Sequence, residues 1–325
     1  MSGRKLPSVQ AGSGKKRPMN SLAGFLVCSV IILPLMTRPP TSAILSAVMA
    51  FGLWGIIPIY WKWIGHLGAD VAVAQRVVWT MAITLPLLLI RSELGQWLRE
   101  LRRADVLRTH SLAAVLLGVN WGTFVWAALH GHLVECSLGY FLNPLLNVVI
   151  GYLLLGERLT RAQTVSIALA TGGVILQMLA VGRPPWIALV LAFSFGFYGL
   201  VRRQSAQGPL AGLATESLVA LPLAGGFLIW QGLHGRAVFG DGGGRDLALV
   251  LGLGVVTTVP LLGFAHAARK LPFSLLGLLQ FLAPTGQFLL GVMAFGEALS
   301  PLSLVAFAFI WTAIAIFCMD LMRRR

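Results

Sequence analysis

The chain has 325 residues, of which 57% are hydrophobic and only 11% are charged, and its mean hydropathy is +0.82. About a quarter of the residues in a soluble domain are charged, so this composition excludes a water-soluble globular protein. It predicts an all-α integral membrane protein. The net charge of +14 does not indicate a nucleic-acid partner, because loops that stay in the cytoplasm collect Lys and Arg.

Residues 1–41 are expected to form an extension outside the fold. Residues 1–20 are basic, polar and rich in Gly and Ser, which favours disorder. The apolar run 21–36 is shorter than the roughly 20 residues that a span needs, and prolines at 39 and 40 end it. Either translation begins downstream, near Met36, or this run forms an eleventh span.

The remainder of the chain contains ten apolar segments of spanning length, separated mostly by short connections. They cover approximately 42–61, 71–90, 111–130, 136–155, 162–181, 186–201, 212–232, 246–268, 273–295 and 302–321. With the N-terminus inside, 20 of the 25 Lys and Arg residues fall in internal segments and four in external loops. This asymmetry predicts that both termini are cytoplasmic.

Two stretches 140 positions apart, 137–159 and 277–299, align without a gap and share Phe, Pro, Gly-Glu and other residues. This alignment predicts two repeats of five spans, 42–181 and 184–322. Because five is odd, the second repeat must enter the membrane upside down relative to the first. Inverted repeats of this kind are typical of transporters, which bind their cargo between the halves near mid-membrane.

Several stretches resemble the RarD-type permeases of the EamA family, in the drug/metabolite transporter superfamily. They are FGLWGIIPIYWK at 51–62, QRVVW at 75–79, Asn120-Trp121, SLGYF at 137–141 and AFSFGFYGLVRR at 192–203. The resemblance implies a ten-span permease of the bacterial inner membrane, of the type linked to chloramphenicol sensitivity. Gln75 stands where the family often has His, which removes a protonatable group from that position.

Two charged residues lie inside predicted spans and away from the span ends, at a depth where a charge costs about 2.5–3.5 kcal/mol. Arg76 and its repeat counterpart Glu216 are therefore expected to face the interior or a cavity, or to anchor their helices near an interface. Inversion places them toward opposite membrane faces, so they are not expected to pair. Their partners are expected to be local polar groups or substrate.

The candidate substrate cavity is formed by polar stripes of the fourth and ninth spans. Tyr140, Asn143 and Asn147 share one helix face, as do Gln280 and Gln287. Trp54 and Tyr198 lie at similar depth in the first and sixth spans. These groups suit a small, neutral or zwitterionic amphipathic ligand. Alternatively, the amides only bond neighbouring helices.

Pro144 and Pro284 are paired by the repeat and are the candidate hinges, because each removes a backbone donor inside a span. Glu157 and Glu297 follow a glycine at the ends of the fourth and ninth spans. Each glutamate is expected to stabilise the first turn of the helix that follows it.

The sequence therefore favours a secondary transporter that exports a small amphipathic metabolite or drug, with protons as the expected coupling ion. No cofactor or metal is expected, and a homodimer is compatible with the sequence. The alternatives are a membrane-embedded enzyme acting on lipid or prenyl substrates, and an assembly partner that transports nothing. The enzyme is disfavoured because the chain lacks clustered carboxylates or histidines within its spans.

Overall fold

The structure is a computed structural model that describes residues 40–155, 159–203, 205–240, 243–271, 276 and 279–323. All regular elements within these residues are helical. This agrees with the predicted all-α class, because a helix satisfies its own backbone hydrogen bonds in lipid. The predictions for residues 1–39, and for Glu157, fall outside the described residues.

The first half contains five long helices and one short helix. They are α2 (Thr41–Ile64), α3 (Ala69–Ile90), α4 (Leu94–Glu100), α5 (Ala104–Leu129), α6 (Leu133–Leu155) and α7 (Arg161–Val181). A capping box starts α7, in which the Thr160 hydroxyl accepts from the Gln163 amide and the Gln163 side chain accepts from the Thr160 amide. Gly182, in the left-handed conformation at φ 74°, ends it.

The second half begins after a short connection. Its helices are α8 (Trp186–Arg203), α9 (Pro209–Leu233), α10 (Gly244–Lys270), α12 (Leu282–Leu289) and α13 (Pro301–Arg323). A π-helical turn over Leu290–Ala294 continues α12. Helix α9 starts with Pro209 in its first turn, where the missing N–H removes no helical hydrogen bond.

Eight of the described helices are long and apolar enough to cross a membrane by length and composition. The sixth and ninth predicted spans correspond to shorter apolar helices, over Trp186–Arg202 and Leu282–Ala294. The chain is thus a multi-pass membrane protein. The count of ten spans remains a prediction.

The connection predicted over 91–110 is shorter in the structure. It contains α4, and α5 begins at Ala104, so the last seven of its residues belong to a helix. The apolar pattern missed this first part of α5 because Asp105, Arg108 and His110 interrupt it. His110 therefore lies inside α5 and is fully buried.

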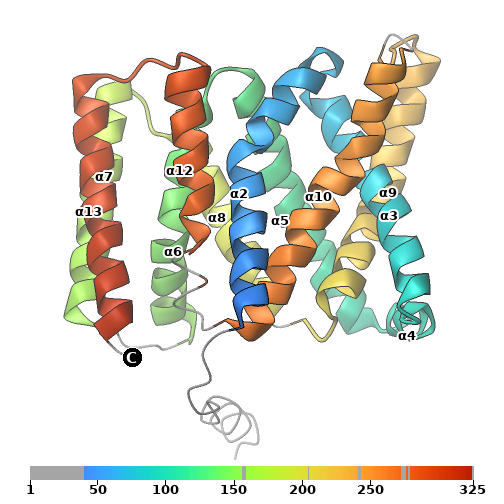
Figure 1. The fold of residues 1–325 in the computed structure, drawn as a ribbon, viewed down its shortest axis with the longest axis horizontal. Coiled ribbons are helices and arrows are strands. Elements are labelled where there is room, and N and C mark those ends of the chain that lie inside the picture. Colours follow the sequence, from blue (N-terminus) through green and yellow to red (C-terminus); the bar gives the residue numbers. More distant parts are fainter. Residues whose placement is uncertain are drawn as a thin grey trace, which may run out of the picture. The chain divides into compact units, whose positions relative to one another are not determined.

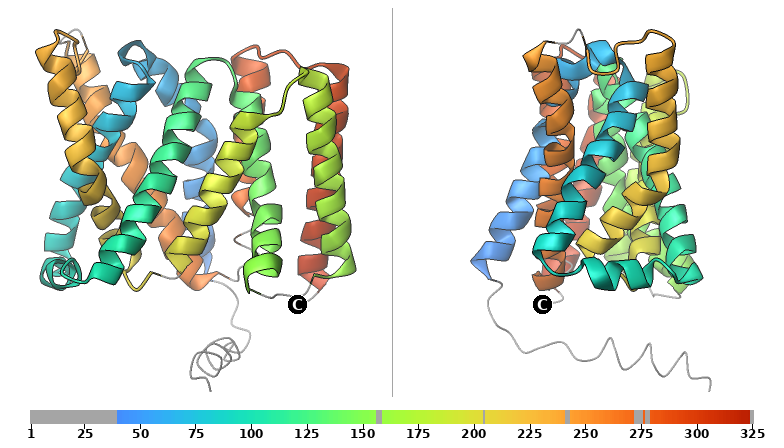
Figure 2. Two further views of the ribbon diagram at one scale, coloured as in Figure 1. Left: turned by 180° about the vertical axis from the view of Figure 1, so that it is seen from behind. Right: turned by 90° about the vertical axis from the view of Figure 1, so that its right-hand side faces the viewer.

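Within the part of the chain from residue 40, consecutive long helices run in alternating directions (Figure 1). Helix α2 runs upward in that view, and α8, which opens the second half, runs downward. Helices α7 and α13 lie side by side in both Figure 1 and Figure 2, and their packing is the most extensive in the structure. Extensive packing also joins α2 to α10, α3 to α9, and α5 to α8.

The largest buried cluster lies where α2, α3, α5, α8 and α10 meet. It includes Trp61, Val71, Val125, Leu191 and Leu253. Small residues let helices approach closely at its edges, as expected in a membrane bundle. A Cβ atom on Gly139 of α6 would lie 2.7 Å from the Ala188 carbonyl oxygen of α8.

Candidate functional site

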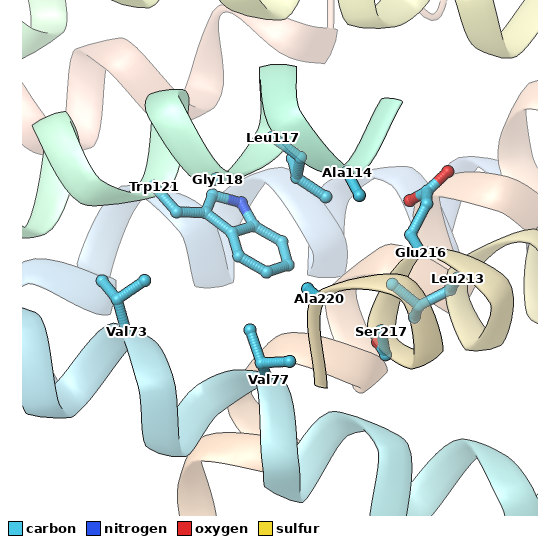
Figure 3. A pocket seen from close by; sticks show the side chains of 10 residues that line it. All are labelled: Val73, Val77, Ala114, Leu117, Gly118, Trp121, Leu213, Glu216, Ser217 and Ala220. Atoms are coloured by element: carbon cyan, nitrogen blue, oxygen red, sulfur yellow. The ribbon is translucent and has the colours of Figure 1, made fainter. Parts of the chain in front are cut away.

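A small cavity of about 40 Å³ lies between α3, α5 and α9. Val73 and Val77 line it from α3, Trp121 from α5, and Glu216 and Ser217 from α9 (Figure 3). The remaining walls are apolar or glycine. A few water molecules would fill it at roughly 10–15 Å³ each.

Arg76 lies two turns into α3, and its side chain contacts Trp121, which lines this cavity. Its side chain is 4% exposed, and its Cζ atom lies 3.5 Å from the centroid of the Trp121 ring and 5.6 Å from that of Trp61. Among the described residues, its guanidinium forms no ion pair with a carboxylate, and Nε has no hydrogen-bond partner. The aromatic faces are therefore its main electrostatic neighbours.

Glu216 has a different environment. Its carboxylate, 3% exposed, lies 3.1 Å from Nδ1 of His110 and 3.3 Å from Nη1 of Arg202. The Tyr198 hydroxyl donates to it over 3.2 Å, and His110 Nε2 lies 2.8 Å from the Ser205 hydroxyl. These local polar groups, and not Arg76, neutralise the carboxylate.

His110, Arg202 and Trp121 were missed as site residues by sequence reasoning. For His110 a signal existed, because the buried residues His110, Ala113, Leu117, Asn120 and Phe124 follow the i, i+3, i+4, i+7 spacing of one helix face. Extending the helix to include that face would have placed His110 inside the bundle. The contact of Trp121 with Arg76 has no such local signal.

Tyr140 of the predicted stripe belongs to a polar network that joins three helices. Its hydroxyl donates to Asn120 Oδ1 over 3.1 Å. The Asn120 amide nitrogen donates to the Leu191 carbonyl oxygen over 3.1 Å and to the Ser194 hydroxyl over 3.0 Å. This network links α5, α6 and α8.

Gln287 bonds a carbonyl that a proline leaves free. Pro58 has no N–H, so the Trp54 carbonyl oxygen one turn earlier lacks its helical partner. The Gln287 amide nitrogen donates to that oxygen over 3.1 Å, which joins α12 to α2. The Gln287 Oε1 atom has no partner among the described residues.

The other predicted cavity residues are not among those that line the cavity between α3, α5 and α9. Asn143 is fully buried, and neither its Oδ1 nor its Nδ2 has a partner among the described residues. Asn147 and Gln280 are half-buried. Trp54 packs against Phe51 and Phe264, with ring centroids 5.7 and 5.8 Å away. Binding of substrate by these residues stays a prediction.

The two repeated segments contact each other through α6 and α12. The rings of Phe141 and Phe281, which occupy equivalent positions, stack with centroids 6.3 Å apart. The paired prolines differ, however. Pro144 lies in the middle of α6, whereas Pro284 is the third residue of α12, where its missing N–H removes no helical bond.

Glu297 does not stabilise the helix that follows it, so that prediction is wrong. Its carboxylate accepts hydrogen bonds from the backbone N–H groups of Leu133 and Val134, over 2.6 and 2.8 Å. These groups open α6 in the other half. Conversely, Glu135 of the first half accepts from the Ile187 N–H in the first turn of α8, over 3.1 Å. Each half thus caps a helix of the other.

The sequence pattern of the EamA-like transporter family matches residues 41–179. Protein RarD of Streptomyces exfoliatus is 42% identical over 275 residues, which cover 84% of this chain and 87% of the relative. An uncharacterized transporter of Pseudomonas aeruginosa is 43% identical over 84% of this chain and 92% of its own length. The chain is a RarD-type member of the EamA family.

A solved crystal structure shares the fold with a TM-score of 0.59, 23% sequence identity, and coverage of 87% of this chain and 99% of that one. Membership of the EamA family makes the protein a membrane transporter and not an enzyme. The lipid bilayer and a small-molecule substrate are the partners that this family indicates.

Proposed function

We propose that the protein is a secondary-active exporter of a small amphipathic metabolite or drug, which works by alternating access between two inverted five-helix halves. The observation that carries this proposal is that packing between helices repeats. Contacts of α2 with α10 and α12 correspond to those of α8 with α5 and α6, and contacts of α3 with α10 correspond to those of α9 with α5. Two halves related in this way support alternating access.

The proposed orientation places both termini in the cytoplasm and the protein in the bacterial inner membrane. Helix α4 and the C-terminus lie at one end of the bundle in Figure 1, and the end of α9 lies at the other. Within the described residues, the basic residues of the predicted internal segments belong to the stretch from the end of α3 to the start of α5, to the start of α7, and to the ends of α8, α10 and α13. These parts of the chain lie at the first end in Figure 1, which fits the positive-inside rule. Under this orientation Glu216 lies toward the cytoplasm and Arg76 toward the outside.

The proposed substrate path runs between the halves, past Trp54, Tyr198 and the amides of α6 and α12. The support is that Asn143 and Gln287 are buried and keep polar atoms that have no partner among the described residues. Such atoms are costly in a dry interior, so a bound molecule or water is expected to satisfy them. Coupling to protons and assembly as a homodimer are parts of this proposal that transport and mass measurements would test.

The experiment is transport by the purified protein in proteoliposomes, with chloramphenicol and a mixture of amphipathic metabolites as cargo. We expect flux of at least one compound that rises with an imposed pH gradient. Pro144→Ala is expected to insert normally but to transport at least tenfold more slowly, because a straightened α6 favours one access state. Absence of flux for every compound, with correctly folded protein, contradicts the proposal.

A further inference from the structure

We propose that Arg76, Trp61 and Trp121 form an anion-recognition site, and hence that the transported molecule carries a carboxylate or a similar acidic group. The inference rests on the proposed transport function. It goes beyond that function because the amide stripe alone favours a neutral or zwitterionic ligand.

The first reason is the charge of Arg76. The guanidinium is almost completely buried and, within the described part of the chain, faces no carboxylate. A buried charge without a counter-ion is strongly unfavourable, so proteins keep one where a ligand supplies the opposite charge. Stacking on two tryptophans offsets only part of this cost.

The second reason is that buried hydrogen-bond donors on α2 and α3 lack acceptors. Nε of Arg76 and Nε1 of Trp61 both lack a partner among the described residues, and the centroid of the Trp61 ring lies 5.6 Å from the Arg76 Cζ atom. The Thr80 hydroxyl, one turn along α3 from Arg76, is also buried without a partner in the described part of the chain. Unpartnered donors favour a ligand rich in acceptors, which describes a carboxylate better than an amide or an amine.

The third reason is geometry. Arg76 presents its face to Trp121 at 3.5 Å, so the N–H groups along its edge remain available for a planar anion. Trp121, on which the guanidinium stacks, also lines the cavity together with Val73 and Val77 (Figure 3), so a ligand group that reaches past Trp121 from the cavity would meet the guanidinium.

The charged groups around the cavity do not compete for Arg76. Glu216 is the acidic lining residue, and its oxygens already bond His110, Arg202 and Tyr198. From α6, the Tyr140 phenol interacts electrostatically with Arg76, and its proton is donated to Asn120. An acidic ligand group is thus attracted to the Arg76 end of the cavity.

The test is a binding measurement on the full-length purified protein in detergent, so it does not depend on transport. Benzoate and benzamide serve as probes, because they have the same shape and differ in charge, and sodium chloride at equal ionic strength controls for salt. We expect benzoate to raise the melting temperature at concentrations at least tenfold lower than benzamide or chloride. Arg76→Gln should abolish this preference, and Arg76→Lys should retain it in part.

The matched control is Arg183→Gln, which removes an arginine whose carboxylate partner is Glu135. This variant should keep the preference for benzoate. Without probe, Arg76→Gln should melt at or above the wild-type temperature, because it removes an uncompensated buried charge. The proposal would be overturned if both probes gave equal responses or if benzoate gave none. It would also be overturned if the preference for benzoate survived Arg76→Gln, or if that change lowered the melting temperature. Benzoate binding without flux in proteoliposomes would instead count against the transport function alone.

Discussion

At the scale of single residues, the two buried charges at equivalent positions of the repeat have different electrostatic surroundings. Arg76 has aromatic neighbours and no counter-ion among the described residues, whereas Glu216 is surrounded by donors. The positions are equivalent in the repeat, yet their surroundings differ because α5 supplies Trp121 to one and His110 to the other. This asymmetry is expected of a transporter whose two faces meet different solutions.

We predict that Glu216→Ala destabilises the protein by about 3–5 kcal/mol, because it removes the acceptor shared by the buried His110 and the half-buried Arg202. Thermal unfolding in detergent measures the change. The control is Asp105→Ala, which breaks an ion pair with Arg103 on the exposed start of α5 and should leave the melting temperature unchanged. Equal effects of both changes would show that the Glu216 cluster contributes nothing beyond an exposed pair.

The contacts made by the buried charged residues could not be predicted from the sequence, for a physical reason. Burial of Arg76 and Glu216 was one of two expectations from their positions within apolar runs, the other being that each anchors its helix near an interface. Their partners did not follow, because Trp61, Trp121, His110 and Arg202 are brought near them by packing between separate helices. Helical periodicity says which face is buried and not which helix covers it.

At the scale of helices, hydropathy located the elements well and their ends less well. The predicted spans 42–61 and 162–181 agree closely with α2 and α7. The start of α5 was missed because polar residues interrupt its apolar pattern, although a helix continues through them. The ninth span was predicted over 273–295 with a hinge at Pro284, and its described later part is the short α12 followed by a π-helical turn.

Helix packing predicts a contrast between two glycines. Gly139→Ala would place a methyl group 2.7 Å from a backbone oxygen of α8, so α6 and α8 must separate. We expect a loss of about 1–3 kcal/mol, measured as a lower melting temperature in detergent. Gly122→Ala in α5 meets nothing within 4 Å and should be neutral or stabilising, because Ala favours helix. Tolerance of both changes would mean that α6 and α8 do not pack as described.

At the scale of the whole molecule, orientation in the membrane is open to a direct measurement. We predict that alkaline phosphatase fused after residue 240 is active and that the same enzyme fused after residue 100 is silent, because alkaline phosphatase folds only outside the cytoplasm. The two positions lie at opposite ends of the bundle, in the connection between α9 and α10 and in α4 (Figure 1). The reverse pattern of activities would invert the proposed topology.

The reciprocal caps made by Glu135 and Glu297 bear on how the protein is made. Helix α6 leaves the ribosome well before Glu297 is synthesised. The N–H groups of Leu133 and Val134 therefore lack their carboxylate acceptor until almost the whole chain has entered the membrane. The first half alone would therefore persist as a partly assembled intermediate, exposed to membrane proteases. Two genes encoding the halves separately would have to be translated together, since neither product could complete its own helix ends.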